Sequence, residues 1–410
     1  MESYSYLHLG EPEDPDRNVV CRYRVTTDLS MEKAAEAIAA EQSTGTWTGI
    51  STLDRSIFDG LGARITSIDG DVITCEFPAE DFSIETGAVP QILSVIAGNL
   101  FGLGALKAVR LEDVTFPKSI LEQFKGPKFG AEGIRKALKR PEEPLVGTIV
   151  KPKIGLSPEK TAEYVYEAGS GGLTNSKDDE TLVAQSFCPI EDRTIRVAEA
   201  LDRLEEEGRM MMHAVNVSTR SDRIVELAEK VQGWGAREIM IDVITCGYGC
   251  LQALAEDPSI KVPIHVHRTM HGAFTKDPRH GINMLVLSKL VRMVGGDALH
   301  IGTLGVGKMA AGAHDDSNLK ACLGDDVLYK AVMPVCSGGV HPSLVADIIA
   351  RSGMDVQIQA GGGVAGHPGG VRAGAMAMSQ AVHAAYEGIP AAEYAESHPE
   401  LRVALERWPR

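Results

Sequence analysis

The chain has 410 residues, of which 44% are hydrophobic and 24% are charged. These values are typical of a globular protein with one large and one small domain, or with two to three ordinary domains. The net charge of −15 argues against a general nucleic-acid or anionic-membrane binder, although a local basic pocket is compatible with it.

The first ten residues, "MESYSYLHLG", have neither the basic start nor the apolar centre of a signal peptide. Apolar runs along the chain stay shorter than the roughly 20 residues that span a bilayer. The seven cysteines are scattered and suggest no disulfide framework. We therefore expect a cytoplasmic protein with reduced thiols.

Strand-like and helix-like segments alternate in the first part of the chain. The strand-like pieces are rich in β-branched and aromatic residues, and the helical ones have the spacing of apolar residues expected of helices. In chain order they are 18–27 (strand), 30–42 (helix), 65–78 (strands) and 89–102 (helix). This order predicts a small N-terminal α+β domain of the ferredoxin-like type, over residues 1–128.

From residue 145, short apolar runs alternate with amphipathic segments of helical length. Eight such pairs over 145–388 fit a (β/α)8 TIM barrel, which typically takes ~250 residues. An open, doubly wound sheet is the alternative. We expect the barrel and a C-terminal helical tail to form a domain over residues 129–410. The predicted strands are 145–153, 172–179, 210–217, 238–244, 262–270, 298–303, 330–338 and 356–363.

Charged side chains collect where these predicted strands end, which is where a barrel enzyme carries its active site. Small residues follow the last two strands, in a position where barrels bind phosphate through backbone N–H groups. Six of the eight strand ends are marked in one of these two ways. The residues are Lys151, Lys153, Lys177, Asp178, Asp179, Glu180, His265, His267, Arg268, His271 and His300, then Ser337, Gly338, Gly339 and Gly361, Gly362, Gly363.

The stretch "GGLTNSKDDE" places Lys177 directly before three acids. Lys177 and Asp179 share a face of a strand, and Glu180 begins the loop. Two carboxylates suit Mg²⁺, but a protonated lysine would repel it. Reaction of the neutral amine with CO₂ would give an anionic carbamate instead. The alternative is an ordinary lysine paired with its acidic neighbours.

Two other motifs are weaker. "HVHRTMH" spaces His267 and His271 as in zinc proteases, but it lacks their glutamate and lies in a strand. "GTLGVGKM" resembles a P-loop until Met309, which replaces the Ser or Thr that binds Mg²⁺. A flexible glycine-rich lid that carries Lys308 to a substrate fits this segment better.

Together these motifs resemble ribulose-1,5-bisphosphate carboxylase/oxygenase (Rubisco) large subunits of the archaeal form III kind. The resemblance covers nearly the whole chain in order. Its segments are "EQSTGTW" (41–47), "AGNLFG" (97–102), "GTIVKPKIGLS", "GGLTNSKDDE", "HVHRTMH", "LHIGTLGVGKM", "CSGGVHP" and "QAGGGVAGHP".

The resemblance implies carboxylation of ribulose 1,5-bisphosphate to two 3-phosphoglycerates through an enediolate held on Mg²⁺, with an oxygenase side reaction. It also implies a homodimer as the minimal unit and CO₂ as activator. Carbamylated Lys177, Asp179 and Glu180 would be the Mg²⁺ ligands. The carbamate would take the C3 proton, His267 would assist hydration, and Lys151 would protonate the product carbanion, with Lys153 beside it.

The remaining roles concern substrate binding and lid closure. Lys308 would close over the site and stabilise the new carboxylate, and Ser337 would contact a substrate hydroxyl. Glu41 and Asn99 would come from the neighbouring subunit, with Glu41 pairing with Lys308. One phosphate would be held by Arg268 and His300, and the other would be surrounded by Thr46, Trp47, Gly339, Gly361 and Gly362, with Gly338 in the same loop.

Several positions depart from the family pattern. Ile149 replaces a threonine, "TNS" (174–176) replaces an Asp-containing pattern, and Met309-Ala310-Ala311 follows the lid lysine. The stretch from Lys308 to Ser337 is shortened. The alternatives are a Rubisco-like enolase, isomerase or decarboxylase that acts on another phosphorylated keto sugar, and a non-catalytic assembly or regulatory protein on the same fold. Retention of Glu41, Asn99, Lys308 and Ser337 favours the carboxylase.

Overall fold

The structure is a computed structural model that describes residues 4–307, 315–324 and 328–409. The chain divides into two compact units, residues 1–125 with 270–293 and residues 126–269 with 294–410. The predicted division at residue 128 placed the segment 270–293 in the barrel. Its clustering with the first unit follows from β10 (Gly281–Ile282), which pairs in parallel with β4 (Ala108–Thr115).

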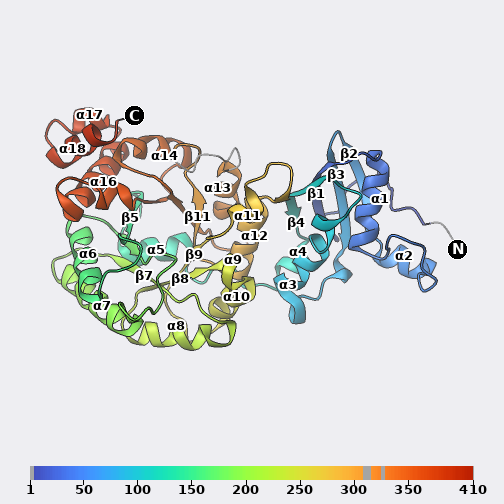
Figure 1. The fold of residues 1–410 in the computed structure, drawn as a ribbon, viewed down its shortest axis with the longest axis horizontal. Helices are drawn as coiled ribbons and strands as arrows, with labels where there is room; N and C mark the ends of the chain where they lie inside the picture. The colour runs from blue at the N-terminus through green and yellow to red at the C-terminus, as the bar shows by residue number, and fades with distance from the viewer. Residues whose placement is uncertain (1–3, 308–314, 325–327, 410) are drawn as a thin grey trace. The chain divides into compact units, whose positions relative to one another are not determined.

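The first unit is built on a five-stranded sheet in the order β10-β4-β1-β3-β2 (Figure 1). β1 (Asn18–Thr26) lies between β3 (Val72–Pro78) and β4, antiparallel to both. β2 (Arg64–Asp69) and β3 form a hairpin whose turn contains Gly70 at φ 60°, the conformation such a turn demands.

Helices pack on this sheet through faces that the sequence defines. α1 (Met31–Gln42) begins at Ser30, whose side chain accepts the N–H of Lys33. Its buried Ala34, Ile38 and their neighbours lie on one side of the helix and contact β2 and β3. The other helices of the unit are α2 (Arg55–Leu61), α3 (Ile84–Ile96), α4 (Lys118–Leu121), α11 (Gly272–Thr275) and α12 (Met284–Val294), with 3-10 turns η1 (Ala79–Asp81) and η2 (Leu100–Gly102).

The second unit is a closed barrel of eight parallel strands in the order β11-β12-β13-β5-β6-β7-β8-β9. All eight predicted strands are present, so the prediction of a TIM barrel is confirmed and the open-sheet alternative is wrong. The strands are β5 (Leu145–Ile149), β6 (Asn175–Lys177), β7 (Met212–Asn216), β8 (Glu238–Asp242), β9 (Ile264–His267), β11 (Ala298–Gly302), β12 (Met333–Ser337) and β13 (Gln357–Gln359).

Helices follow one another around the barrel, as Figure 1 shows for the green and yellow-green α6, α7 and α8. No helix in the described part of the chain is long and apolar enough to cross a membrane. The helices of this unit are α5 (Gly130–Leu138), α6 (Pro158–Ser170), α7 (Ile190–Glu206), α8 (Ile224–Gly233), α9 (Val243–Cys246), α10 (Tyr248–Glu256), α13 (Asp315–Leu323), α14 (Val345–Ser352), α15 (Gly362–Ala365), α16 (Gly370–Tyr386), α17 (Ala391–Tyr394) and α18 (Pro399–Arg407), with η3 (Ser221–Arg223) and η4 (Pro342–Leu344).

One end of the barrel is plugged by α5. Ala131, Ile134 and Leu138 of this helix join the first residues of several strands, among them Leu145 and Met333, in a single buried cluster. Because the N-terminal ends of the strands are covered in this way, chemistry is left to their C-terminal ends.

Candidate active site

Lys177 is the last residue of β6, and its side chain is 1% exposed. Its Nζ donates to the backbone oxygen of Asp178 at 2.9 Å and lies 3.6 Å from Oε2 of Glu180. Burial lowers the pKa of this amine, and the positive charge of Lys151 adds to that effect, although Glu180 and Asp179 oppose it. The lysine that the sequence singled out is therefore enclosed among charged groups.

Asp179 and Glu180 both face cationic lysines. Nζ of Lys151 donates to Oδ2 of Asp179 at 2.8 Å, and Nζ of Lys153 lies 3.6 Å from Oε1 of Glu180. Partial burial would raise the pKa of Glu180, but His267, Lys177 and Lys153 outweigh it and lower that pKa to about 2. The two carboxylates thus lie close to three amines, and carboxylate oxygens are ligands that a hard cation accepts.

Asp178 points away from the lysines into a buried network. Its Oδ2 accepts from Nε and Nη2 of Arg193 at 3.2 and 3.1 Å and from the N–H of Asn216 at 3.0 Å, while Oδ1 lies 3.2 Å from Nε2 of His213. Burial would raise the pKa of Asp178, yet Arg193 and His213 lower it to about 2. This network fixes the backbone between Lys177 and Asp179.

His267 connects the acidic group to the next strands. Its Nδ1 lies 2.8 Å from Oδ1 of Asp242, and its Nε2 lies 3.8 Å from Oε2 of Glu180. Burial and the charge of Lys177 lower the pKa of His267, which favours a neutral imidazole. The sequence analysis missed Asp242, although an acid at the end of a predicted strand was the same signal that marked the other strand ends.

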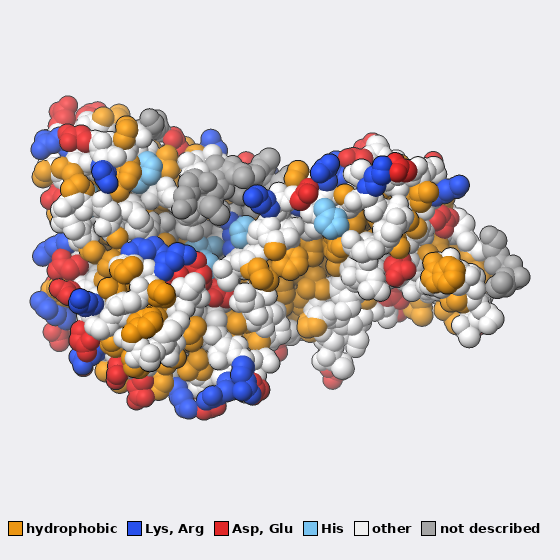
Figure 2. Space-filling view, in the orientation of Figure 1, with side chains coloured by type: hydrophobic (Ala, Val, Ile, Leu, Met, Phe, Trp, Pro, Cys, Tyr) orange, Lys and Arg blue, Asp and Glu red, His pale blue; other side chains and the backbone are white. Residues whose placement is uncertain are grey.

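His300 on β11 extends the line of polar groups. Its ring lies 4.7 Å from that of His267, centre to centre, and its Nδ1 lies 2.7 Å from Oγ of Ser337 on β12. Burial, together with His267, His265 and Arg268, lowers the pKa of His300 well below its usual value. Histidine, basic and acidic side chains gather toward the middle of the barrel unit in Figure 2.

Glycines line the loops that follow β12 and β13. Gly338 and Gly339 have φ of 114° and 79°, which an L side chain rarely adopts. A Cβ at Gly361 would lie 2.9 Å from Cε of Lys151, so glycine allows the lysine to approach the backbone. Gly362 begins α15. Backbone N–H groups in such loops suit an anionic ligand.

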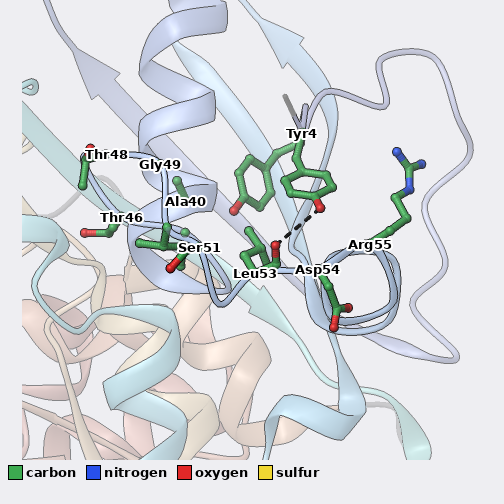
Figure 3. Close-up of a pocket in the computed structure, with 12 residues that line it drawn as sticks. Tyr4, Ala40, Thr46, Thr48, Gly49, Ser51, Leu53, Asp54 and Arg55 are labelled. Atoms are coloured by element: carbon green, nitrogen blue, oxygen red, sulfur yellow. Dashed lines mark hydrogen bonds between the residues drawn. The ribbon is translucent and has the colours of Figure 1, made fainter. Parts of the chain in front are cut away.

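The predicted residues of the first unit form a separate group. Nδ2 of Asn99 lies 3.5 Å from Oε1 of Glu41, and the indole of Trp47 is 91% exposed. Thr46 and Tyr6 both line a pocket of about 850 Å³. At the same pocket the hydroxyl of Tyr4 donates a hydrogen bond to the backbone carbonyl of Leu53 (Figure 3).

Eight predicted barrel residues thus make direct contacts in two groups, Lys151 with Asp179 and the other six around Glu180 and His267. Lys308 and Met309-Ala310-Ala311 lie outside the described residues. Arg268 directly follows His267, and its charge acts on His300. The linked residues are Lys151, Lys153, Lys177, Asp179, Glu180, His267, His300 and Ser337.

Comparison with known proteins adds to this geometry. Residues 130–408 match the model of the ribulose bisphosphate carboxylase large chain, catalytic domain, and residues 9–120 match its N-terminal domain. The chain is 41% identical to the ribulose bisphosphate carboxylase of Methanocaldococcus jannaschii over 408 residues, 92% of this chain and 94% of that protein.

Two solved structures are similar over nearly the whole chain. The octameric Rubisco of Pyrococcus horikoshii OT3 has a TM-score of 0.92 and 38% identity, covering 98% of this chain and 96% of that one. The dimeric archaeal Rubisco of Hyperthermus butylicus has a TM-score of 0.87 and 37% identity, covering 98% of both chains.

Proposed function

The chain belongs to the ribulose bisphosphate carboxylase large-chain family, and from this premise we propose how its residues join CO₂ to ribulose 1,5-bisphosphate. The reaction is a carboxylation that yields two molecules of 3-phosphoglycerate. The observation that supports it best is the set of contacts at the strand ends. Lys151 contacts Asp179, Lys177 and His267 both contact the adjacent Glu180, and the ring of His267 lies against that of His300. A Rubisco-like enolase would need only the residues that abstract the C3 proton and hold the metal.

Mg²⁺ would be held by Asp179, Glu180 and Lys177 as its carbamate. Within the described residues, no three His, Cys, Asp or Glu side chains are grouped so that they could hold a metal. The two carboxylates therefore need a third ligand of another kind. Lys177 supports this role, because it is buried beside both acids and its pKa is lowered, which increases the neutral amine that reacts with CO₂.

When bound, Mg²⁺ would supply a Lewis acid that stabilises negative charge developing on the substrate oxygens. Lys151 and Lys153 now contact the two carboxylates, so both lysines would have to move before the carboxylates could hold the metal. Lys151 would then be free to act as the proton donor to the product carbanion. Its contact with Asp179 supports this role, because the ammonium lies beside a proposed metal ligand.

His267 would assist the hydration step. Its Nδ1 is held by Asp242, so the ring is oriented and its Nε2 faces the acidic group. A neutral imidazole, favoured by the lowered pKa, can accept a proton from water. Asp242 thus has the role of orienting a general base.

The two phosphates of the substrate would bind at different places. Arg268 and His300 would hold one, and the glycine loops at Gly339, Gly361 and Gly362 would surround the other through backbone N–H groups. Thr46 and Trp47 would complete the second phosphate site, and Ser337 would contact a substrate hydroxyl. Ile149 has no hydroxyl to offer, and the adjacent Thr148 is engaged with Tyr164 and the Ala360 carbonyl.

We propose a homodimer as the minimal active unit, with each site shared between subunits. The octameric and dimeric assemblies named for the two archaeal structures support this. Glu41 and Asn99 contact each other, and the neighbouring Trp47 is exposed, as expected for groups that serve a second subunit. Lys308 would pair with Glu41 when the lid closes.

The experiment is to incubate the enzyme with ribulose 1,5-bisphosphate, Mg²⁺ and labelled bicarbonate, and to measure acid-stable label in 3-phosphoglycerate. Two product molecules per substrate consumed are expected. Exchange of the C3 proton without fixed label would instead establish the Rubisco-like enolase.

A further inference from the structure

Four polar side chains on four neighbouring strands form a line through the barrel interior. Glu238 on β8 lies 3.5 Å from His265 on β9, measured from Oε1 to Nδ1. Nε2 of His265 lies 2.8 Å from Nε2 of His300 on β11, and Nδ1 of His300 lies 2.7 Å from Oγ of Ser337 on β12. The line therefore runs from the closed centre of the barrel to a residue at the C-terminal end of a strand.

The deep end of this line is fully buried and has few partners. Glu238 and His265 are both fully buried. Among the described residues, no hydrogen-bond partner exists for either carboxylate oxygen of Glu238 or for Nδ1 of His265. The 3.5 Å gap is slightly longer than an ordinary hydrogen bond. Because a buried charge without a partner is costly, the two groups are each other's available partner.

The pair resembles the Asp242–His267 pair one layer above, but Glu238 reaches Nδ1 of His265 from two residues before the register partner of that histidine. β8 carries Asp242 and Glu238 four residues apart on the inner face, and β9 carries His267 and His265 two residues apart. The backbone register pairs Asp242 with His267 and Met240 with His265. A carboxylate beside Nδ1 is thus present at both levels, and only the upper one is explained by the function proposed above.

The hydrogen-bond line has a direction that Glu238 can set. A carboxylate beside Nδ1 favours the tautomer of His265 with its proton on that nitrogen, and in this tautomer Nε2 is left as an acceptor. Nε2 of His300 must then carry the proton that joins the two rings. Nδ1 of His300 is consequently an acceptor, and the hydroxyl of Ser337 donates to it. The lowered pKa of His300 agrees with a neutral ring in this position.

We propose that Glu238 is a positioning residue that fixes the tautomers of His265 and His300 and thereby turns the Ser337 hydroxyl toward His300. The oxygen lone pairs of Ser337 are then presented to the substrate as an acceptor. This inference rests on the proposed function for the role of Ser337, but the tautomers themselves exist in the free enzyme.

The test is nitrogen NMR of histidine-labelled enzyme without substrate, with ring signals assigned through single histidine variants. Wild type should show His265 protonated on Nδ1 and His300 protonated on Nε2. Glu238→Leu removes the acceptor, so His265 should move its proton to Nε2, and His300 should then be protonated on Nδ1. Glu238→Gln keeps the shape, and its amide can donate or accept, so both tautomers should appear even if Glu238→Leu does not fold.

Kinetics provides a second readout. In Glu238→Leu, His300 donates to Ser337 and occupies one of its two lone pairs, so KM for ribulose 1,5-bisphosphate should rise about tenfold, the cost of one misdirected hydrogen bond. Glu238→Gln, with both tautomers present, should show a smaller rise. A purely structural role would lower the active fraction and kcat but leave KM unchanged. The matched control is Glu76→Gln, another fully buried glutamate, which lies in the first unit and accepts from Asn18.

The outcomes separate the two proposals. An unprotonated Nδ1 on His265 in wild type, or wild-type tautomers in the folded Glu238 variants, would overturn the positioning role. Equal tautomer changes in Glu76→Gln would do the same. If the tautomers change as expected but wild type fixes no CO₂, the positioning role stands and the carboxylase proposal fails.

Discussion

The ion pair between Arg193 and Asp178 is predicted to stabilise the barrel and the strand end that carries Lys177. Both side chains are completely buried. Arg193→Met would leave the Asp178 carboxylate without its guanidinium and would also remove the donors to the Cys188 and Val183 carbonyls. Breaking a buried pair in this way typically costs about 3–5 kcal/mol.

The pKa of Asp178 gives an independent magnitude. Its lowering from 3.8 to about 2 corresponds to a stabilisation on the order of 2 kcal/mol. Because the pKa in the folded state is depressed, this contribution is fully present above pH about 4 and is lost as the pH falls toward about 2. Arg193→Met should therefore lose most of this acid-dependent stability while it is already destabilised at neutral pH.

The assay is thermal and urea unfolding of wild type, Arg193→Met and the double variant Asp178→Asn/Arg193→Met. A cost of 3–5 kcal/mol should lower the barrel transition by about 6–20 °C, at roughly 2–4 °C per kcal/mol. The double variant should recover part of the loss, because no unpaired charge remains buried.

The matched control is Arg237→Met, which removes ion pairs with the more exposed Asp202 and Glu205 and should cost less than about 1 kcal/mol. A loss in Arg193→Met no larger than in this control, or a double variant that is less stable than the single one, would refute the reasoning.

Two further predictions concern the shared site and the lid. Mixing inactive Lys177→Ala chains with inactive Asn99→Ala chains should restore activity in hybrid dimers, because one intact site can form in each hybrid. If subunit exchange is demonstrated and activity does not recover, the shared site is contradicted. Lys308→Ala should nearly abolish carboxylation but leave C3 proton exchange measurable, because enolisation precedes CO₂ capture. An equal loss of both activities would place Lys308 in an earlier step.

Much of the barrel could be predicted because its strands are short apolar runs between amphipathic helices. The strand-end rule singled out Lys151, Lys177, His267 and His300. In the structure the last three are joined through Glu180, and Lys151 contacts Asp179. Such residues are visible in sequence because charges are rare at the ends of buried strands.

The supporting residues were harder to predict. Arg193 lies in α7 among other charged residues, and only the fold reveals that it is buried against Asp178. Glu238 is the first residue of its strand, a position at which a charged side chain is usually predicted to be exposed. In the structure it is fully buried and faces the barrel interior. The segment 270–293 joins the first unit through pairing of β10 with β4, a contact between residues far apart in the chain.

The proposed mechanism depends on Lys177, whose amine would react with CO₂ to form a carbamate that binds Mg²⁺. Lys177, Asp179 and Glu180 sum to −1 with an ammonium and to −3 with a carbamate, and only the second state gives three anionic ligands for Mg²⁺. Lys177→Arg keeps the positive charge but cannot form the carbamate in the same way.

The direct measurement is label fixed from CO₂ after preincubation of wild type and Lys177→Arg with or without bicarbonate and Mg²⁺ together. Because carbamate formation consumes the neutral amine, activation of wild type should rise with pH. We predict fixation only by preincubated wild type and none by a folded Lys177→Arg enzyme at any CO₂ level. Full activity of Lys177→Arg, or wild-type activity independent of preincubation, would contradict the carbamate.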